Sequence, residues 1–366
     1  MKKFLTGIAF LSIASLSLSA CGSTVEKSEE SAKNSEKGVI KVVTSTDVYA
    51  NIVESIGGDT VEVTPLINST SEDPHSYEAT SADRLSVKDA QLVVLNGGGY
   101  DQFLENMAGQ DHKDQKVLNA VEISGLQKDD DHAHEHDHEH GDDHAHEHGD
   151  EHAHAHEHGD EHAHSHEHGD EHSHEHGDEH AHSHEHGHHH HHHGDFNEHV
   201  WYDFVAMQKL AGAIAEDLAE EAPEHAEQYR QAAGKFKSEL GELISQTRGI
   251  NAEGKKYIAT EPVPGYLLTM AGFSDATPSE LTSAVESGSD IAPLIMNQVK
   301  EELQEKQVGF FAYNEQTSSP QTEELLKDAQ EAQIPHVSFT ETLPEGKDYL
   351  GWMKENIENI KKSLTS

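Results

Sequence analysis

The feature that most constrains this chain is a tract of 67 residues, Asp129 to Asp195, that contains 29 histidines, 22 carboxylates and no lysine or arginine. The pentapeptide His-Glu-His-Gly-Asp recurs in it, beginning at His146, His156, His166 and His174. Because the tract has no apolar residue larger than alanine, it has nothing to bury and we expect it to be disordered. The fold must therefore be built from the two stretches on either side of it.

The net charge and the cysteine count exclude several classes of protein. The chain has 366 residues and a formal net charge of −44, half of which lies in the tract. Such a charge repels nucleic acid and anionic lipid, so neither is expected as the main partner. The single cysteine, Cys21, can form neither an internal disulfide nor a cysteine-type zinc finger. The length suits about two domains.

The N-terminus is typical of an exported protein. Residues 1–20 are expected to be a signal peptide, since two lysines precede an apolar run, Phe4 to Leu18, that is too short to span a bilayer. The run ends in Leu18-Ser19-Ala20-Cys21, which resembles the lipobox of bacterial lipoproteins and implies lipidation of Cys21. A buried thiol in an uncleaved leader is the alternative. The polar residues 21–38 should then tether a soluble body to the extracytoplasmic face of the cell membrane.

Both stretches beside the tract alternate short apolar runs with amphipathic segments, a pattern typical of an α/β fold with parallel sheets. The first stretch should contain strands at Val39–Val43, Val61–Ile67 and Leu92–Leu95, with helices at Tyr49–Ile56 and Ser81–Asp89. The second should contain strands at Tyr257–Thr260, Gly309–Tyr313 and His336–Phe339, with helices at Pro293–Gln304 and Thr322–Ala332. We therefore expect two lobes, each with a parallel sheet and flanking helices.

A long helical pattern lies between the strands of the two stretches. Its apolar residues recur every three or four positions, at Met207, Leu210, Ile214 and Leu218, then at Tyr229, Phe236, Leu240 and Leu243. Pro223 should restart the helix, so residues 223–248 should form one rigid helix of about 39 Å that joins the lobes. The expected N-terminal lobe is then 39–222, interrupted by the disordered loop 129–195, and the C-terminal lobe is 249–366.

Histidine in such abundance points to metal. Imidazole is the commonest protein ligand for Zn²⁺, Ni²⁺ and Cu²⁺, so the tract must bind such ions to some degree, although a linker that drifted by repeat slippage is a plainer interpretation. A selective site needs a few ligands on the folded scaffold, and in open α/β sheets these lie at the carboxyl ends of strands. Four residues meet that condition: His75, His199, Glu261 and Glu341. The other histidines outside the tract are expected to be surface or core residues: His112, His225 and His336.

Around these residues the chain resembles a known family, the zinc- and manganese-binding lipoproteins of bacterial ABC importers whose lobes are joined by a rigid helix. Asp73-Pro74-His75-Ser76-Tyr77-Glu78 is similar to the first ligand region of that family. Glu198-His199-Val200-Trp201-Tyr202-Asp203 is similar to the second. The similarity extends from about Val39 to Lys361, with a histidine-rich insertion where zinc-binding members often carry one.

The resemblance implies that His75, His199, Glu261 and Glu341 are metal ligands. It also implies a monomeric binding protein, without enzymatic activity, that delivers its metal to an ABC permease and the associated ATPase. Zinc-binding members usually have histidine at the position of Glu261, manganese-binding members have glutamate there, and aspartate is more usual than Glu341. The fourth donor therefore stays open between Glu341, a water and three neighbouring side chains: Asn314, Thr340 and Thr342.

The donor set bears on the choice of metal. Two imidazoles and two carboxylates match a dication in charge. Hard oxygens favour Mn²⁺ more than a three-histidine site would, but Zn²⁺ binds more tightly than Mn²⁺ at nearly any site of nitrogen and oxygen. Zn²⁺ is therefore the expected cargo, and Mn²⁺ is the alternative.

Two further functions compete with transport. A surface metal buffer or chaperone would act through the tract and need no transporter. A zinc hydrolase would need an open coordination position and a general base. Outside the tract the chain has no His-Glu-x-x-His motif, and four protein ligands would close the coordination sphere.

Overall fold

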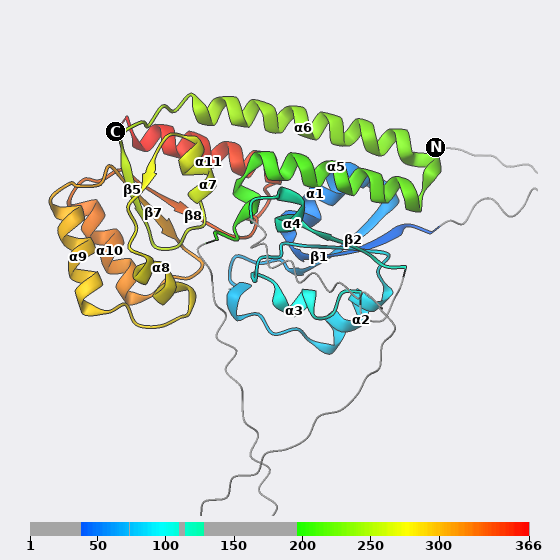
Figure 1. Ribbon diagram of the computed structural model, residues 1–366, viewed down its shortest axis with the longest axis horizontal. Coiled ribbons are helices and arrows are strands. Elements are labelled where there is room, and N and C mark those ends of the chain that lie inside the picture. The colour runs from blue at the N-terminus through cyan, green and yellow to red at the C-terminus, as the bar shows by residue number, and fades with distance from the viewer. Residues whose placement is uncertain (1–37, 73, 110–113, 128–195, 366) are drawn as a thin grey trace, which may run out of the picture.

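The computed structural model describes residues 38–72, 74–109, 114–127 and 196–365. The expected signal peptide, Cys21, most of the tether and the histidine-rich tract lie outside these ranges, as do Asp73 and His112. Figure 1 shows two lobes side by side, each built around one sheet. No helix within the described ranges is both long enough and apolar enough to cross a membrane.

The sheet of the first lobe has four parallel strands in the order β2-β1-β3-β4. These are β1 (Ile40–Thr46), β2 (Val61–Ile67), β3 (Leu92–Leu95) and β4 (Lys116–Asn119). The three strands predicted in this stretch are confirmed, and β1 continues beyond its apolar run through Thr44-Ser45-Thr46, all of which are buried. Polar side chains thus occupy the carboxyl end of β1, at the edge that faces the second lobe.

Helices cover both faces of this sheet. They are α1 (Asp47–Gly57), α2 (Ser81–Asp89), α3 (Gln102–Glu105), α4 (Ala120–Ser124) and α5 (Phe204–Glu221). The α2 helix begins with a capping box, in which the side chain of Thr80 accepts from the backbone of Asp83 and the Asp83 carboxylate accepts in return. In Figure 1, α1 and α5 lie on one face of the sheet, and α2 and α3 lie on the other.

The second lobe repeats this plan, with parallel strands in the order β6-β5-β7-β8. The strands are β5 (Lys256–Ala259), β6 (Ser274–Asp275), β7 (Phe310–Asn314) and β8 (His336–Phe339). The helices are α7 (Gly265–Met270), α8 (Ser279–Glu286), α9 (Pro293–Gln304), α10 (Pro320–Glu331) and α11 (Tyr349–Ser363). The predicted fold class, two α/β lobes with parallel sheets, is therefore confirmed.

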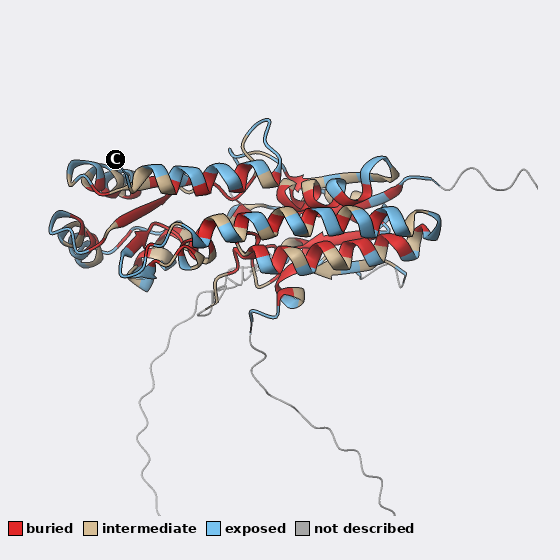
Figure 2. Ribbon diagram, turned by 90° about the horizontal axis from the view of Figure 1, so that it is seen from above, coloured by how far each residue is buried: buried red, intermediate tan, exposed pale blue. Residues whose placement is uncertain are grey.

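A single long helix, α6 (Ala226–Arg248), runs along both lobes (Figure 1). Its 23 residues correspond to about 35 Å. The segment from Pro223 starts with a 3-10 turn, η4 (Pro223–His225), and the α-helix begins only at Ala226, three residues later than predicted. Four apolar side chains of the predicted pattern are buried on its inner face: Tyr229, Phe236, Leu240 and Leu243. Figure 2 shows the same division, with exposed residues on the outer faces of the long helices.

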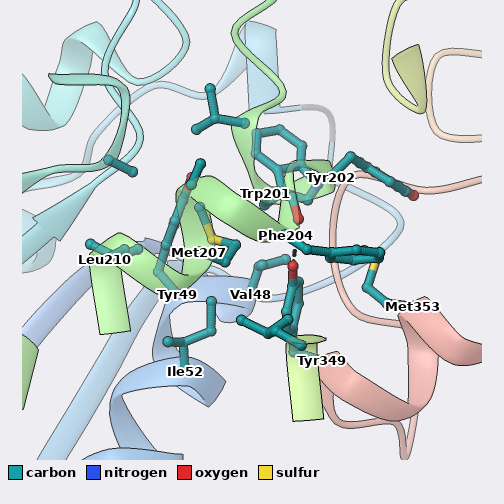
Figure 3. Close-up of a cluster of buried hydrophobic side chains, with 14 of the residues drawn as sticks. Val48, Tyr49, Ile52, Trp201, Tyr202, Phe204, Met207, Leu210, Tyr349 and Met353 are labelled. Carbon is teal, nitrogen blue, oxygen red and sulfur yellow. Dashed lines mark hydrogen bonds between the residues drawn. The ribbon is translucent and has the colours of Figure 1, made fainter. Parts of the chain in front are cut away.

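The two lobes share one hydrophobic core. Figure 3 shows Tyr49 of α1, Phe204 of α5 and Tyr349 of α11 packed together, so the last helix of the chain contacts the first lobe. The Tyr349 hydroxyl donates to the backbone oxygen of Trp201 at 2.6 Å. Two backbone amides of the second lobe donate to α1: Leu343 N to Asp47 Oδ1 at 3.0 Å, and Tyr349 N to Asn51 Oδ1 at 2.9 Å.

Replacing Tyr349 by phenylalanine tests this junction. The ring still fits, but the buried oxygen of Trp201 loses its donor, so the free energy of unfolding should fall by about 1–3 kcal/mol. Urea denaturation followed by circular dichroism measures the change. The control is Leu294→Ala, because Leu294 is 77% exposed and its loss should change stability by less than about 0.5 kcal/mol. Equal stabilities of the two variants would contradict the role given to this hydrogen bond.

Candidate metal centre

His75 lies in a short 3-10 turn, η2 (Pro74–Ser76), that follows strand β2. Its side chain is largely buried and points toward the second lobe, where its Nε2 lies 3.5 Å from Glu341 Oε2. The imidazole packs edge-on against the ring of Tyr100, with centroids 5.3 Å apart. The first predicted ligand is thus held at the carboxyl end of the first sheet.

His199 is fully buried and immediately precedes the 3-10 turn η3 (Val200–Tyr202). Asn197 fixes the orientation of its ring. The Asn197 Oδ1 accepts from the backbone amide of His199 at 3.0 Å and lies 2.8 Å from Nδ1 of the same residue. Since Oδ1 can only accept, Nδ1 must be the donor, which leaves the Nε2 lone pair of the neutral ring available for a metal. That Nε2 lies 3.7 Å from Glu341 Oε2.

Asn197 also joins this segment to the second lobe. Its Nδ2 donates to the backbone oxygen of Pro262 at 2.8 Å, and its own backbone oxygen accepts from Tyr266 at 2.6 Å. The chain that presents His199 is therefore fastened to the loop that presents Glu261.

The two carboxylates come from two strands of the second sheet that lie on either side of a third. Glu261 follows β5 and Glu341 follows β8, while Asn314 ends β7, the strand between them. The Asn314 Nδ2 donates both to Glu261 Oε2 and to Glu341 Oε1, the latter at 2.8 Å. Thr317 Oγ1 also donates to Glu261 Oε2, at 2.6 Å. The expectation that the carboxyl ends of strands meet at one point therefore holds for both glutamates.

Three of the four predicted ligands converge without rearrangement. Ligand atoms of His75, His199 and Glu341 all lie within 4.8 Å of one another. Two donors of a tetrahedral zinc ion, each about 2.1 Å from it, are about 3.4 Å apart. The distances of 3.5 and 3.7 Å from Glu341 Oε2 to the two Nε2 atoms are close to that spacing. Glu261 is not part of this group. It is linked to the group by Asn314, which donates to both Glu261 and Glu341.

The charges of the site are coupled. Burial opposes the charge of His75, but attraction by Glu341 outweighs it and raises the pKa of His75 to about 10. The pKa of His199 is raised as well, against its burial, by the hydrogen bond and charge of Glu341 and the charge of Glu198. Burial would raise the pKa of Glu341, but the two histidines hold it well below its usual range. In the metal-free site, protonated imidazole thus balances the Glu341 carboxylate.

Glu261 behaves differently from Glu341. Burial, together with the charge of Glu341, raises its pKa to about 7. Its Oε1 is buried and has no hydrogen-bond partner among the described residues. Burial without a partner is costly for a carboxylate oxygen, and a metal ion would remove that cost.

The alternative fourth donors point elsewhere. Thr340 Oγ1 donates to the backbone oxygen of Thr342, and Thr342 Oγ1 donates to Gln316 Oε1. Asn314 presents its amide nitrogen to the site, and a nitrogen whose hydrogens point at two carboxylates cannot bind a cation. The two histidines expected to be surface or core residues lie away from the cluster, His225 in η4 and His336 on β8.

Sequence reasoning missed the contribution of Tyr100. Its hydroxyl donates to Glu341 Oε2 at 3.1 Å, and its ring also contacts His75, as described above. Tyr100 follows the run Gly97-Gly98-Gly99, in which all three glycines have positive φ. This turn lies at the carboxyl end of β3, so the position of Tyr100 carried a signal in the sequence, whereas its hydrogen bond to Glu341 carried none.

The chain is similar in sequence to known proteins over most of its length. Residues 42–363 match the family described as zinc-uptake complex component A, periplasmic. The high-affinity zinc uptake system protein ZnuA of Bacillus subtilis (strain 168) is 25% identical over 375 residues, which cover 100% of this chain and 99% of that protein. The manganese-binding lipoprotein MntA of Halalkalibacterium halodurans is 27% identical over 124 residues, 34% of this chain and 38% of that protein. The match with this manganese-binding relative thus spans less than half of its length.

Solved structures share the fold. The periplasmic zinc binding protein TroA from Treponema pallidum aligns with a TM-score of 0.60 and 16% identity, over 89% of this chain and 99% of that chain. The binding protein FpvC from Pseudomonas aeruginosa, in complex with Mn²⁺, aligns with a TM-score of 0.61 and 17% identity, over 90% of this chain and 99% of that chain. At these identities the likeness concerns the fold.

The charges of the site predict that metal binding releases protons. At pH 8, His75 with a pKa of about 10 is still protonated. A metal needs the lone pair of His75, so at least one proton should leave per ion bound at this site. Calorimetry in buffers of different ionisation enthalpy counts these protons.

The number of protons released on metal binding also sets how the affinity depends on pH. While His75 remains protonated, each proton released should strengthen apparent binding about tenfold per pH unit, so affinity should rise from pH 7 to pH 8. The His75→Gln variant should release about one proton fewer at pH 8. Identical proton counts for this variant and the unaltered chain would show that His75 is neutral before the metal binds.

Proposed function

The chain belongs to the family of zinc-uptake complex component A, and on this premise we propose that it captures a divalent transition metal outside the cytoplasm and delivers it to an ABC permease with its ATPase. The observation that carries the proposal is the buried cluster of His75, His199 and Glu341 between the lobes. Members of this family are solute-binding proteins, so we assign the chain a role in binding rather than in catalysis.

Four protein ligands are proposed for the metal. They are Nε2 of His75, Nε2 of His199, Oε2 of Glu341 and Oε1 of Glu261, the oxygen that has no hydrogen-bond partner among the described residues. Two neutral imidazoles and two carboxylates leave the loaded site without net charge. We propose Zn²⁺ as the cargo, since it outcompetes Mn²⁺ at a site of these donors.

The remaining parts of the proposal concern residues outside the described ranges. Lipid on Cys21 would anchor the protein, as a monomer, to the outer face of the cell membrane, which fits the lipoprotein names of its manganese-binding relatives. The tract Asp129–Asp195 would collect metal with lower affinity near the site. It ends four residues before His199, so metal held there would be close to the ligands.

Removing both imidazoles of the cluster tests the function. In the full chain, His75→Ala combined with His199→Ala should weaken the tight site by about a hundredfold or more, because loss of direct ligands costs more than loss of their hydrogen-bond partners. A zinc-buffered fluorescent indicator measures the affinity. The matched control, His225→Ala with His336→Ala, removes the same number of imidazoles outside the cluster and should leave the tight site intact.

The same pair of variants separates transport from buffering. Cells carrying the cluster variant should fail to grow in medium depleted of zinc by a chelator, whereas cells carrying the control should grow. Normal growth of the cluster variant would favour a surface metal buffer that acts through the tract.

Deleting Asp129–Asp195 tests the role of the tract. The deletion should slow zinc uptake when zinc is scarce and leave one tight site in titration calorimetry, because the described ligands all lie outside the deleted residues. Loss of the tight site would mean that the tract supplies ligands to it.

A further inference from the structure

Asn314 holds one oxygen of each carboxylate of the centre. Asn314 Nδ2 donates to Glu261 Oε2 and to Glu341 Oε1, and Thr317 Oγ1 adds a second donor to Glu261 Oε2. Of the opposite oxygens, Glu261 Oε1 has no hydrogen-bond partner among the described residues, and Glu341 Oε2 lies near both imidazoles and accepts from the Tyr100 hydroxyl at 3.1 Å. Each glutamate therefore offers one oxygen.

Strand register places Asn314 between the carboxylates. In the parallel pairing of β5 with β7, Ala259 is opposite Ala312, so Glu261 is level with Asn314. In the pairing of β7 with β8, Asn314 is opposite Phe339, two residues before Glu341. One short side chain at the end of the central strand thus reaches the side chains delivered by both neighbours.

The amide of Asn314 is held in a single orientation. The side chain is 2% exposed, and its Oδ1 accepts from the backbone amide of Gln316 at 3.1 Å. Its own backbone amide donates to Thr260 Oγ1 at 2.9 Å. A flip of the amide would break the bond from Gln316 and turn an oxygen toward two carboxylates. Asn314 therefore acts as a fixed donor.

A hydrogen bond from a fixed donor to one carboxylate oxygen orients the group and favours metal binding through the other oxygen. Two imidazoles and two single oxygens make four ligands, the number that Zn²⁺ takes in tetrahedral sites. Mn²⁺ prefers six mostly oxygen ligands, which this set would reach only through bidentate carboxylates or several waters. His199, Glu261 and Glu341 are each at most 1% exposed, which leaves little room for water.

We propose that Asn314 is a positioning residue that keeps Glu261 and Glu341 monodentate and so makes the centre selective for a four-coordinate cation, Zn²⁺, over Mn²⁺. This inference rests on the proposed function, because it assumes that the cluster holds the transported metal. It assigns the selectivity to a side chain that does not touch the ion.

The test compares the full chain with Asn314→Leu, which keeps the volume and removes both donors. Glu341 Oε1 then loses its donor and Glu341 can turn to bind through both oxygens, while Thr317 still holds Glu261 Oε2, so the ratio of the Mn²⁺ to the Zn²⁺ dissociation constant should fall at least tenfold. Using a ratio cancels losses that affect both metals equally. Asn314→Ser keeps one hydroxyl donor and should give an intermediate ratio, and it serves in place of the leucine variant if that variant does not fold.

Co²⁺ at less than one equivalent reports the coordination number directly. The unaltered chain should show the intense visible bands of tetrahedral Co²⁺, and Asn314→Leu should show the weak bands of five- or six-coordinate Co²⁺. The spectrum of the chain with His75→Ala and His199→Ala provides the background from the tract. The control, Asn356→Leu, makes the same substitution at a buried asparagine of α11 and should keep the intense bands.

The possible outcomes distinguish failure of the role given to Asn314 from failure of the proposed function. A tetrahedral spectrum and an unchanged metal ratio in Asn314→Leu would overturn the role of Asn314 and leave the proposed function standing. Weak Co²⁺ bands in the unaltered chain, together with tight binding, would also overturn the role of Asn314 and leave the proposed function standing. Absence of any tight site in the unaltered chain would instead overturn the proposed function.

Discussion

The structure depends on keeping two acidic side chains, Glu261 and Glu341, buried beside each other without bulk water. Such carboxylates repel, and each would raise the pKa of the other if nothing intervened. Asn314 donates to both, the histidines hold the pKa of Glu341 low, and Glu261 is left with a pKa raised to about 7. Protons on the imidazoles and a bound dication are therefore alternative ways to balance the same charges.

Much of the fold could be predicted because its strands are continuous apolar runs. Parallel strands buried on both faces, such as Leu92–Leu95, differ clearly from the amphipathic helices between them. The strands that escaped prediction lack this signal: Lys116–Asn119 has only two apolar residues and is partly exposed, and Ser274–Asp275 has none. Both lie at sheet edges, where pairing with a neighbour rather than composition defines the strand.

Part of the site could also be predicted from the sequence, and part could not. His75, His199, Glu261 and Glu341 were accessible from the sequence because the ends of parallel strands meet at one edge. The orientation of a hydrogen-bond donor could not be predicted from the sequence. The sequence left Asn314 as a possible ligand, but in the structure its Oδ1 accepts from the backbone amide of Gln316 and not from the centre. The hydrogen bond from Tyr100 to Glu341 joins residues 241 positions apart, and only the packing of one lobe against the other brings them together.

The position of α11 has a consequence for how the protein comes to be folded. This helix is the last described element of the chain, yet its Tyr349 and Met353 complete the core around Tyr49 in the first lobe. The first lobe therefore lacks part of its interior until Tyr349–Ser363 has been released. A chain that still lacks residues 341–363 would also lack Glu341, and it could not assemble the group of His75, His199 and Glu341.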